Sequence, residues 1–308
     1  LTTIYRVWGR LRQPLLAEWE SAISSPVDFC ARAGHGAIDA VWDMAYEDEL
    51  CKAQGRLSAC SVSDLSMFYE QIPHASLLHV CRNLSSSSGC KYNPKPFPLA
   101  ICLLCLSMYA GTRRLGANGS VSSGCSTLQA VIAGCTAATT LVKAYVLVPV
   151  SDFAERWPFL SLKVYIDDFL TRWRGRCKED IVDLIHCTRD LCDLLLRVLR
   201  CPVGVGAKSP FIICECPSVQ AFGEPLARQC CIRWVREGPY LGCDYSSGAP
   251  LRSKHKLKGR FAHMKLRKNR FRTLGRFTQT DLLLKSAIGP SVLYAVPAFG
   301  LDNQRLHS

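Results

Sequence analysis

The sequence has a shortage of acidic residues, and no signal peptide is visible in it. It contains 25 Asp and Glu residues against 38 Lys and Arg, which gives a formal net charge of +13 over 308 residues. This balance argues against an acidic small molecule as the main ligand and favours a polyanionic partner. Without a visible secretory signal, we expect an intracellular location, nuclear or cytoplasmic. A chain of this length can hold one large domain or two modest ones.

The 18 cysteines lack the spacing of a zinc site or of a disulfide framework. Cys102-x-x-Cys105 has no second pair or His partner at ligand spacing, and Cys214-x-Cys216 is likewise alone. Many cysteines, including Cys102, Cys105, Cys192 and Cys214, stand inside apolar runs, where a free thiol behaves as a small hydrophobic side chain. We therefore expect free thiols and no metal cluster.

A long uninterrupted apolar run is also missing. The most apolar stretch covers roughly residues 125–150, and it contains five Thr or Ser residues, Gln129 and Lys143. A helix that crosses a bilayer needs about 20 predominantly apolar residues. We expect no membrane partner, and a transmembrane helix over this stretch is the alternative.

Two adjacent carboxylates stand between β-prone runs. Residues 162–173 read Leu-Lys-Val-Tyr-Ile-Asp-Asp-Phe-Leu-Thr-Arg-Trp, which predicts a hairpin with Asp167 and Asp168 at its tip. Neighbouring like charges are unfavourable unless a cation neutralises them. Mg²⁺ binds carboxylate oxygens together with substrate phosphates. A solvated Asp-Asp turn is the alternative.

A third carboxylate follows an upstream strand pattern. Residues 57–64 form a small-residue and apolar run that ends at Asp64, and apolar positions then recur at helical spacing as far as Ile72. The pattern predicts a strand that carries Asp64 at its C-terminal end, although Asp64 also suits a helix N-cap. Three carboxylates at strand ends can hold two metal ions about 3.5–4 Å apart, as in phosphoryl transfer.

These segments resemble the catalytic motifs of reverse transcriptases of the non-LTR, LINE-like retroelement type. The tetrapeptide at 165–168 is similar to the family's Tyr/Phe-x-Asp-Asp box, and Asp64 with Tyr69 resembles its first motif. The resemblance implies that Asp64 and Asp167 are the principal catalytic metal ligands and that Asp168 is the accessory one. It implies that Tyr69 excludes a 2′-hydroxyl and so favours dNTPs, and that Tyr165 contacts the substrate. For Tyr69, a core aromatic on a helix face is the alternative.

Further segments follow in the family's order. Residues 123–142 resemble its glycine-containing helix, in which Gly134 lies against the template and nascent base pair; Ala133 replaces the family's Gln. The helical spacing of apolar residues over 179–200 predicts an amphipathic helix, and a strand is expected at 211–214. In the family this unit is the fourth motif, in which Lys208 protonates the pyrophosphate; a surface lysine is the alternative. Residues 240–245 resemble the Leu-Gly turn of the primer grip.

The C-terminal part is strongly basic. From Arg252 to Arg276 there are eleven Lys or Arg residues and no acids, with apolar residues interleaved. This predicts one or two basic helices with one packed face, suited to contacting backbone phosphates without reading sequence. A nuclear-localisation patch and a membrane-surface helix are the alternatives. The expected nucleic-acid-binding residues are Lys254, Lys256, Lys258, Arg260, Lys265, Arg267, Lys268, Arg270 and Arg272.

The resemblance implies an α+β right-hand polymerase: partial fingers over 1–56, a palm over 57–248 with an antiparallel sheet backed by helices, and a basic helical thumb over 249–308. It implies that a DNA primer is extended with dNTPs on an RNA or DNA template, with two Mg²⁺ or Mn²⁺ ions. The alternatives are an RNA-dependent RNA polymerase and a catalytically inactive nucleic-acid-binding remnant. Since the chain starts at Leu1 and shows no recognisable nuclease, integrase or RNase H region, we expect a fragment of a longer open reading frame.

Overall fold

The computed structural model describes residues 3–245, apart from 33, 87, 88, 113, 115, 118, 119 and 215, together with residue 262. These residues belong to two compact units, each built from several stretches of the chain. Unit 1 comprises Leu1–Ala33, Ser63–Leu170 and Cys187–Ser209, and unit 2 comprises Gly34–Val62, Thr171–His186 and Pro210–Ser308. The expected thumb lies outside the described residues except for residue 262. The nine basic residues named above, from Lys254 to Arg272, lie outside them as well.

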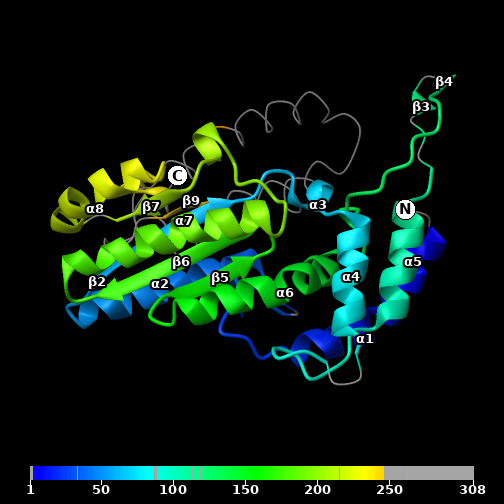
Figure 1. Ribbon diagram of the computed structural model, residues 1–308, viewed down its shortest axis with the longest axis horizontal. Helices are drawn as coiled ribbons and strands as arrows, with labels where there is room; N and C mark the ends of the chain where they lie inside the picture. The colour runs from blue at the N-terminus through cyan, green and yellow to red at the C-terminus, as the bar shows by residue number, and fades with distance from the viewer. Residues whose placement is uncertain are drawn as a thin grey trace, which may run out of the picture. The chain divides into compact units, whose positions relative to one another are not determined.

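Unit 1 is mostly helical. Helices α4 and α5 lie side by side, and α6 is buried on most of its surface, which is typical of a helix inside a core (Figure 1). The helices are α1 (Thr3–Ser21), α3 (Phe68–Gln71), α4 (His74–Leu84), α5 (Leu99–Tyr109), α6 (Ala138–Arg156) and the C-terminal part of α7 (Ile181–Arg197). The strands lying wholly in unit 1 are β1 (Asp28–Phe29), β3 (Gly116–Ala117), β4 (Ser120–Val121) and β5 (Ser161–Tyr165), and η2 (Gly206–Lys208) is a short 3₁₀ helix. No helix in the described part of the chain is both long and apolar enough to cross a membrane.

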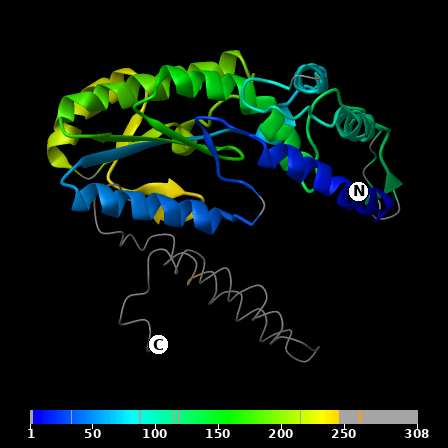
Figure 2. The same cartoon turned by 90° about the horizontal axis from the view of Figure 1, so that it is seen from below.

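Unit 2 places helices on both faces of its strands. Its helices are α2 (Ala37–Ala53), η1 (Lys178–Asp180), the start of α7, and α8 (Pro217–Gln229). Its own strands are β7 (Phe211–Ile213), β8 (Arg233–Val235), β9 (Gly238–Tyr240) and β10 (Cys243–Tyr245). Figure 2 shows α2 and α8 on opposite faces of these strands.

The six strands of the main sheet follow the order β1-β5-β6-β2-β7-β8. Strand β2 comprises Leu57–Asp64, and strand β6 comprises Asp168–Gly175. β1 pairs with β5 and β7 with β8 in the parallel sense, whereas β2 pairs with β7 in the antiparallel sense. The expectation of an antiparallel sheet is therefore wrong, and the sheet is mixed. The reason at one edge is the crossover through α8, which returns the chain to the same end of the sheet and so makes β8 parallel to β7.

The local predictions of the sequence have different outcomes. The predicted strand over 57–64 is confirmed as β2, and the predicted strand at 211–214 is confirmed as β7. The helix predicted within 179–200 is confirmed as η1 followed by α7. The helix expected over 123–142 is wrong, because α6 begins only at Ala138. Gly134 stands in the preceding turn with φ of 82°, a left-handed conformation that cannot continue a right-handed helix. None of the 18 cysteines, all of which lie among the described residues, is paired in a disulfide, and most are buried.

Candidate active site

The three predicted carboxylates stand where strands end or turn. Asp64 is the last residue of β2, Asp167 lies in the two-residue turn between β5 and β6, and Asp168 is the first residue of β6. The other turn residue, Ile166, has φ of 59°. A β-branched residue rarely adopts this left-handed conformation. Strain of this kind costs about 1–3 kcal/mol and is concentrated at functional sites.

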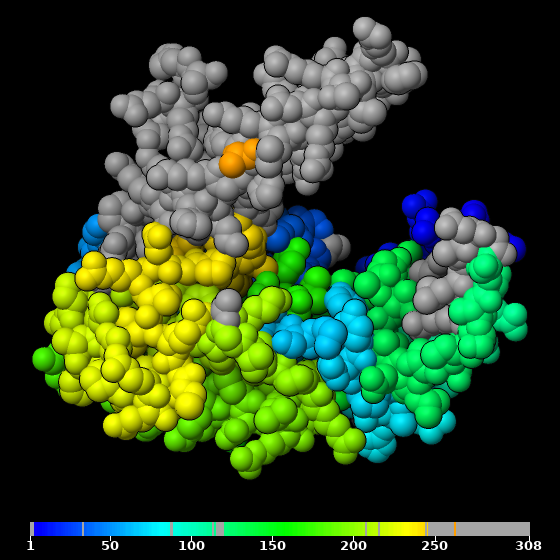
Figure 3. Space-filling view, turned by 90° about the horizontal axis from the view of Figure 1, so that it is seen from above, coloured from blue at the N-terminus to red at the C-terminus, as the bar shows by residue number. Residues whose placement is uncertain are grey.

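Backbone hydrogen bonds bring these segments together. The amide of Leu65 donates to the carbonyl of Asp167 over 3.2 Å, and the amide of Gly204 donates to the carbonyl of Asp64 over 2.9 Å. The residues that follow β2 therefore contact both the β5–β6 turn and the segment that leads to Lys208. In the space-filling view of Figure 3 the light-blue segment after β2 and the yellow-green segment near η2 lie side by side on the surface.

The carboxylates repel one another. Burial raises the pKa of Asp168 to about 7, and the nearby charges of Asp167 and Asp64 contribute to the rise. Burial also raises the pKa of Asp167, again with a contribution from Asp64. The site thus gathers carboxylate oxygens and negative charge in a half-buried position.

A lysine ammonium already contacts one of these acids. Lys208 Nζ lies 2.9 Å from Asp64 Oδ2, and the side chains of Lys208 and Asp64 are 65% and 26% exposed. The hydrogen bond to Asp64 raises the pKa of Lys208. Among the described residues, no group of three or more His, Cys, Asp or Glu side chains is arranged to hold a metal ion as it stands. The three carboxylates would have to reorient to share a cation.

The two predicted substrate-contacting tyrosines lie near the acids. Burial raises the pKa of Tyr69 to about 12, with further contributions from Asp167 and then Tyr165. Tyr69 belongs to α3, and its carbonyl accepts a hydrogen bond of 2.7 Å from the amide of Val131. Gly134 is different: it is exposed, and apart from its own atoms and its two chain neighbours no described atom lies within 4 Å of the position that a Cβ would occupy. The structure therefore groups Tyr69 and Tyr165 with the carboxylates and leaves Gly134 in an open turn.

Two residues near the site were missed by the sequence reasoning. Glu70 adds a further acid, because its charge contributes to the raised pKa of Asp167. Its position directly after Tyr69 in the first motif was the available signal. Gly204 binds the Asp64 carbonyl through its amide. The Gly-Val-Gly sequence at 204–206 marked a tight turn before Lys208.

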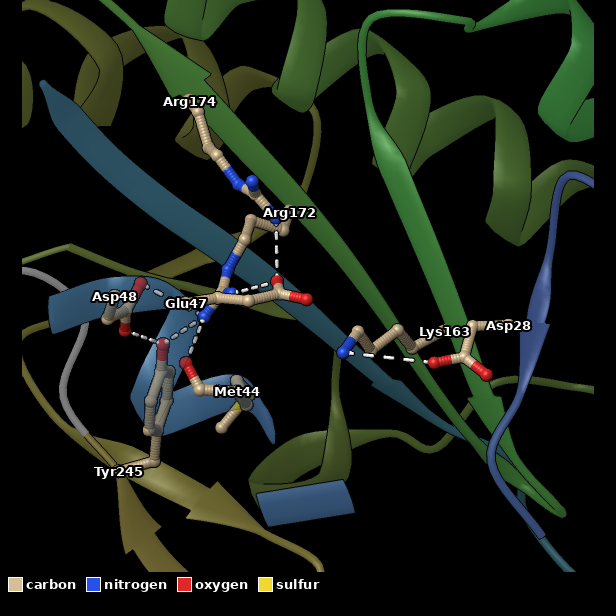
Figure 4. Close-up of polar contacts among 8 residues, drawn as sticks. All are labelled: Asp28, Met44, Glu47, Asp48, Lys163, Arg172, Arg174 and Tyr245. Carbon is tan, nitrogen blue, oxygen red and sulfur yellow. Dashed lines mark hydrogen bonds and ion pairs between the residues drawn. The ribbon is translucent and has the colours of Figure 1, made fainter. Parts of the chain in front are cut away.

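A separate polar cluster was also missed. In unit 2 the guanidinium of Arg172, on β6 and 1% exposed, pairs with Asp48 Oδ1 at 3.0 Å and with Glu47, both on α2 (Figure 4). It also donates to the Met44 carbonyl over 2.7 Å and to the Tyr245 hydroxyl over 3.1 Å. The Tyr245 hydroxyl in turn donates to Asp48. These contacts tie α2, β6 and β10 together and have a structural role. No local sequence pattern signals them, because the partners are distant along the chain.

The Leu-Gly segment forms a tight hairpin between β9 and β10. Leu241 has φ of 45° and Gly242 has φ of 76°. A two-residue type I′ turn requires positive φ at both central positions, and its twist matches that of the flanking strands. The turn expected from the sequence is therefore present.

Comparison with known proteins gives a likeness of fold. No protein-family model matches the sequence, and no curated protein matches it either. Telomerase from Candida albicans, in complex with the TWJ fragment of telomeric RNA, matches with a TM-score of 0.50 at 11% identity, over 96% of this chain and 53% of that chain. Apo telomerase from Candida tropicalis matches with a TM-score of 0.49 at 12% identity, over 85% of this chain and 44% of that chain. The chain thus spans about half the length of the telomerase structures that it matches. The first of these likenesses indicates a fold like that of the Candida albicans telomerase structure.

Proposed function

We propose that this chain is the catalytic part of a reverse transcriptase of the non-LTR type, which extends a primer 3′-OH with dNTPs on an RNA or DNA template. The observation that carries the proposal is the grouping of Asp64, Asp167, Asp168 and Lys208 around the end of β2 and the β5–β6 turn. Transfer of a nucleotidyl group depends mainly on positioning and on neutralising charge. Carboxylates beside a cationic proton donor supply the groups for positioning the substrate and for neutralising its charge.

The carboxylates would hold Mg²⁺ or Mn²⁺, in line with their hard oxygen donors. When bound, such ions neutralise the triphosphate and lower the pKa of the attacking 3′-OH. The chain's own side chains would do the rest. Lys208 would donate a proton to the departing pyrophosphate, and Tyr69 would pack against the incoming sugar and leave no room for a 2′-hydroxyl. Tyr165 would contact the substrate beside the β5–β6 turn.

The proposed partners are an RNA template and a DNA primer. The net charge of +13 supports a polyanionic partner. The telomerase from Candida albicans, whose fold this chain resembles, is bound to a fragment of telomeric RNA in its structure. For the present chain, we propose that the basic segment from Lys254 to Arg272 grips the duplex through its phosphates, with an affinity that falls as salt rises.

A second candidate is a nucleic-acid-binding remnant without catalysis. One observation favours it: Ala133 replaces the family's Gln. An RNA-dependent RNA polymerase is less favoured, because the half-buried Tyr69 lies close to the acids, where room for a 2′-hydroxyl would be needed.

Primer extension with an Asp167→Asn variant tests the proposal. On poly(rA)/oligo(dT) with dTTP and Mg²⁺ or Mn²⁺, we expect the native chain to extend the primer and Asp167→Asn to abolish extension. Duplex binding, measured by fluorescence anisotropy on the same preparations, should remain nearly unchanged. Asp193→Asn, an exposed acid on α7, serves as the matched control and should retain extension.

The outcomes separate the candidates. Extension that persists in Asp167→Asn would discard the proposed mechanism. Duplex binding by the native chain without extension under either metal would establish the remnant. Extension with rNTPs in preference to dNTPs would establish the RNA polymerase.

A further inference from the structure

Unit 1 contains four buried cysteines that lie close together as two pairs. Cys81 lies on α4, Cys102 and Cys105 lie one turn apart on α5, and Cys135 lies just before α6. The thiol of Cys81 forms a hydrogen bond with that of Cys102. The thiol of Cys105 forms a hydrogen bond with that of Cys135. Each pair therefore joins two different segments of unit 1.

The Cys105–Cys135 pair shares one phenol hydroxyl. Tyr5 Oη, from α1, lies 3.2 Å from Cys105 Sγ and 3.1 Å from Cys135 Sγ. Helix α1 packs tightly against the residue that follows Cys135. A Cβ at Gly9, one turn after Tyr5, would lie 2.1 Å from Thr136 Oγ1. This close packing holds both sulfur atoms against the same hydroxyl group.

The two thiols of this pair differ in charge. The hydrogen bond with Cys105 holds the pKa of Cys135 well below its usual range; the Tyr5 hydroxyl adds to this effect, and burial opposes it. The same hydrogen bond, together with burial, raises the pKa of Cys105. Cys135 is therefore the ionised member of the pair at neutral pH, and Cys105 keeps its proton. The thiolate is the form of cysteine that reacts with oxidants.

The Cys81–Cys102 pair is less suited to oxidation. Its hydrogen bond, together with burial, raises the pKa of Cys81, so this thiol stays neutral. Both of its side chains are 0% exposed, as is that of Cys105, whereas Cys135 is 6% exposed. A small oxidant that reaches these cysteines therefore meets the Cys135 sulfur first.

We infer that Cys105 and Cys135 form a reversible disulfide when the chain meets a hydroperoxide. The Cys135 sulfur attacks one peroxide oxygen: an S–O bond forms, the O–O bond breaks, and the other oxygen leaves as hydroxide or alkoxide. The Cys105 sulfur then attacks the resulting sulfenic acid. An S–S bond forms, the S–O bond breaks, and the oxygen leaves as water with the proton of the Cys105 thiol. Two electrons pass from the two sulfurs to the peroxide.

The disulfide would tie α5 covalently to the segment that precedes α6. That segment also contacts the helix of the proposed sugar-contacting tyrosine, because the amide of Val131 donates to the carbonyl of Tyr69 over 2.7 Å. Oxidation would therefore restrict a segment that borders the candidate active site. The inference goes beyond the proposed function and does not depend on it, because the disulfide can form whether or not the chain extends primers.

Peptide mapping of the oxidised full chain tests the inference. The reduced chain is treated with hydrogen peroxide, quenched with catalase, alkylated in denaturant and digested without reduction. Peptides joined through Cys105 and Cys135 should form the most abundant intramolecular disulfide, and dithiothreitol should remove it. When the oxidation itself is carried out in guanidinium chloride, the yield of this disulfide should fall by about tenfold, because the two cysteines then meet only by chance closure of a loop.

Three variants separate the roles of the two sulfurs. Cys135→Ser should abolish the disulfide and leave Cys105 reduced. Cys105→Ser should leave Cys135 as a sulfenic acid, which dimedone traps. Cys201→Ser is the matched control, because Cys201 is also buried and its thiol donates to the carbonyl of Leu199. This variant should form the disulfide as the native chain does, and circular dichroism spectra check that all three variants are folded.

Three results would overturn the inference. The first is a native chain in which Cys105 and Cys135 stay reduced while the exposed Cys177 is oxidised. The second is a disulfide between Cys81 and Cys102 that exceeds the one between Cys105 and Cys135. The third is an equal yield of the Cys105–Cys135 disulfide in the folded and the unfolded chain, which would show that the fold does not direct the pairing.

Discussion

Replacing Asp168 by Asn should make the chain more stable at neutral and alkaline pH. In the folded chain, burial together with Asp167 and Asp64 raises the pKa of Asp168 from 3.8 to about 7. The folded state therefore keeps this proton to higher pH than the unfolded state does. The stability that the protonated carboxyl contributes is fully present below about pH 4 and is lost as the pH rises through about 7.

The magnitude follows from the size of the shift. A change from 3.8 to about 7 corresponds to at most about 4 kcal/mol. Solvent screening of a half-buried group lowers this value, so we expect about 2 kcal/mol. Asn has nearly the same shape and carries no charge. Asp168→Asn should therefore have a higher free energy of unfolding than the native chain at pH 8 and nearly the same free energy at pH 4.

Melting temperatures measured by differential scanning fluorimetry between pH 4 and pH 8, in EDTA, check this expectation. At pH 8, Asp168→Asn should melt roughly 4–8 °C above the native chain, and the difference should vanish toward pH 4. Asp193→Asn, which replaces a 54% exposed acid, is the control and should melt close to the native temperature at pH 8. The reasoning is refuted if Asp168→Asn melts at or below the native temperature at pH 8.

Two further predictions concern the proposed sugar-contacting tyrosine and the polar cluster of unit 2. Tyr69→Val should raise incorporation of rATP relative to dATP by about tenfold; an unchanged ratio in single-nucleotide extension would contradict a steric role. Arg172→Met should lower the free energy of unfolding by about 3–5 kcal/mol, because the buried Asp48 loses its cation, whereas Glu47 keeps its ion pair with Arg174. Urea denaturation measures this, with Arg189→Met, at an exposed ion pair, as a control expected within about 0.5 kcal/mol. A loss equal to the control would show that the cluster is not stabilising.

The sequence alone determined the features that depend on neighbouring residues. The run that ends at Asp64 predicted a strand, and β2 ends there. The alternating apolar residues around Asp167 and Asp168 predicted a hairpin, and the turn lies at 166–167. These predictions succeeded because side-chain period and turn chemistry are local properties.

Only the tertiary structure decided which distant segments meet. The bond from the Leu65 amide to the Asp167 carbonyl groups the acids, and the turn closed by Gly204 sets Lys208 against Asp64. No periodic pattern of apolar residues predicts these contacts, because they depend on how distant segments of the chain pack together. The parallel strand pairs at the two edges of the sheet also could not be predicted from local sequence, because they follow from long crossover connections. The left-handed turn at Gly134 could not be predicted either, because the run of small residues around it resembled a helix. The residue types of the site were therefore visible in the sequence, and their arrangement was set by long-range hydrogen bonding and packing.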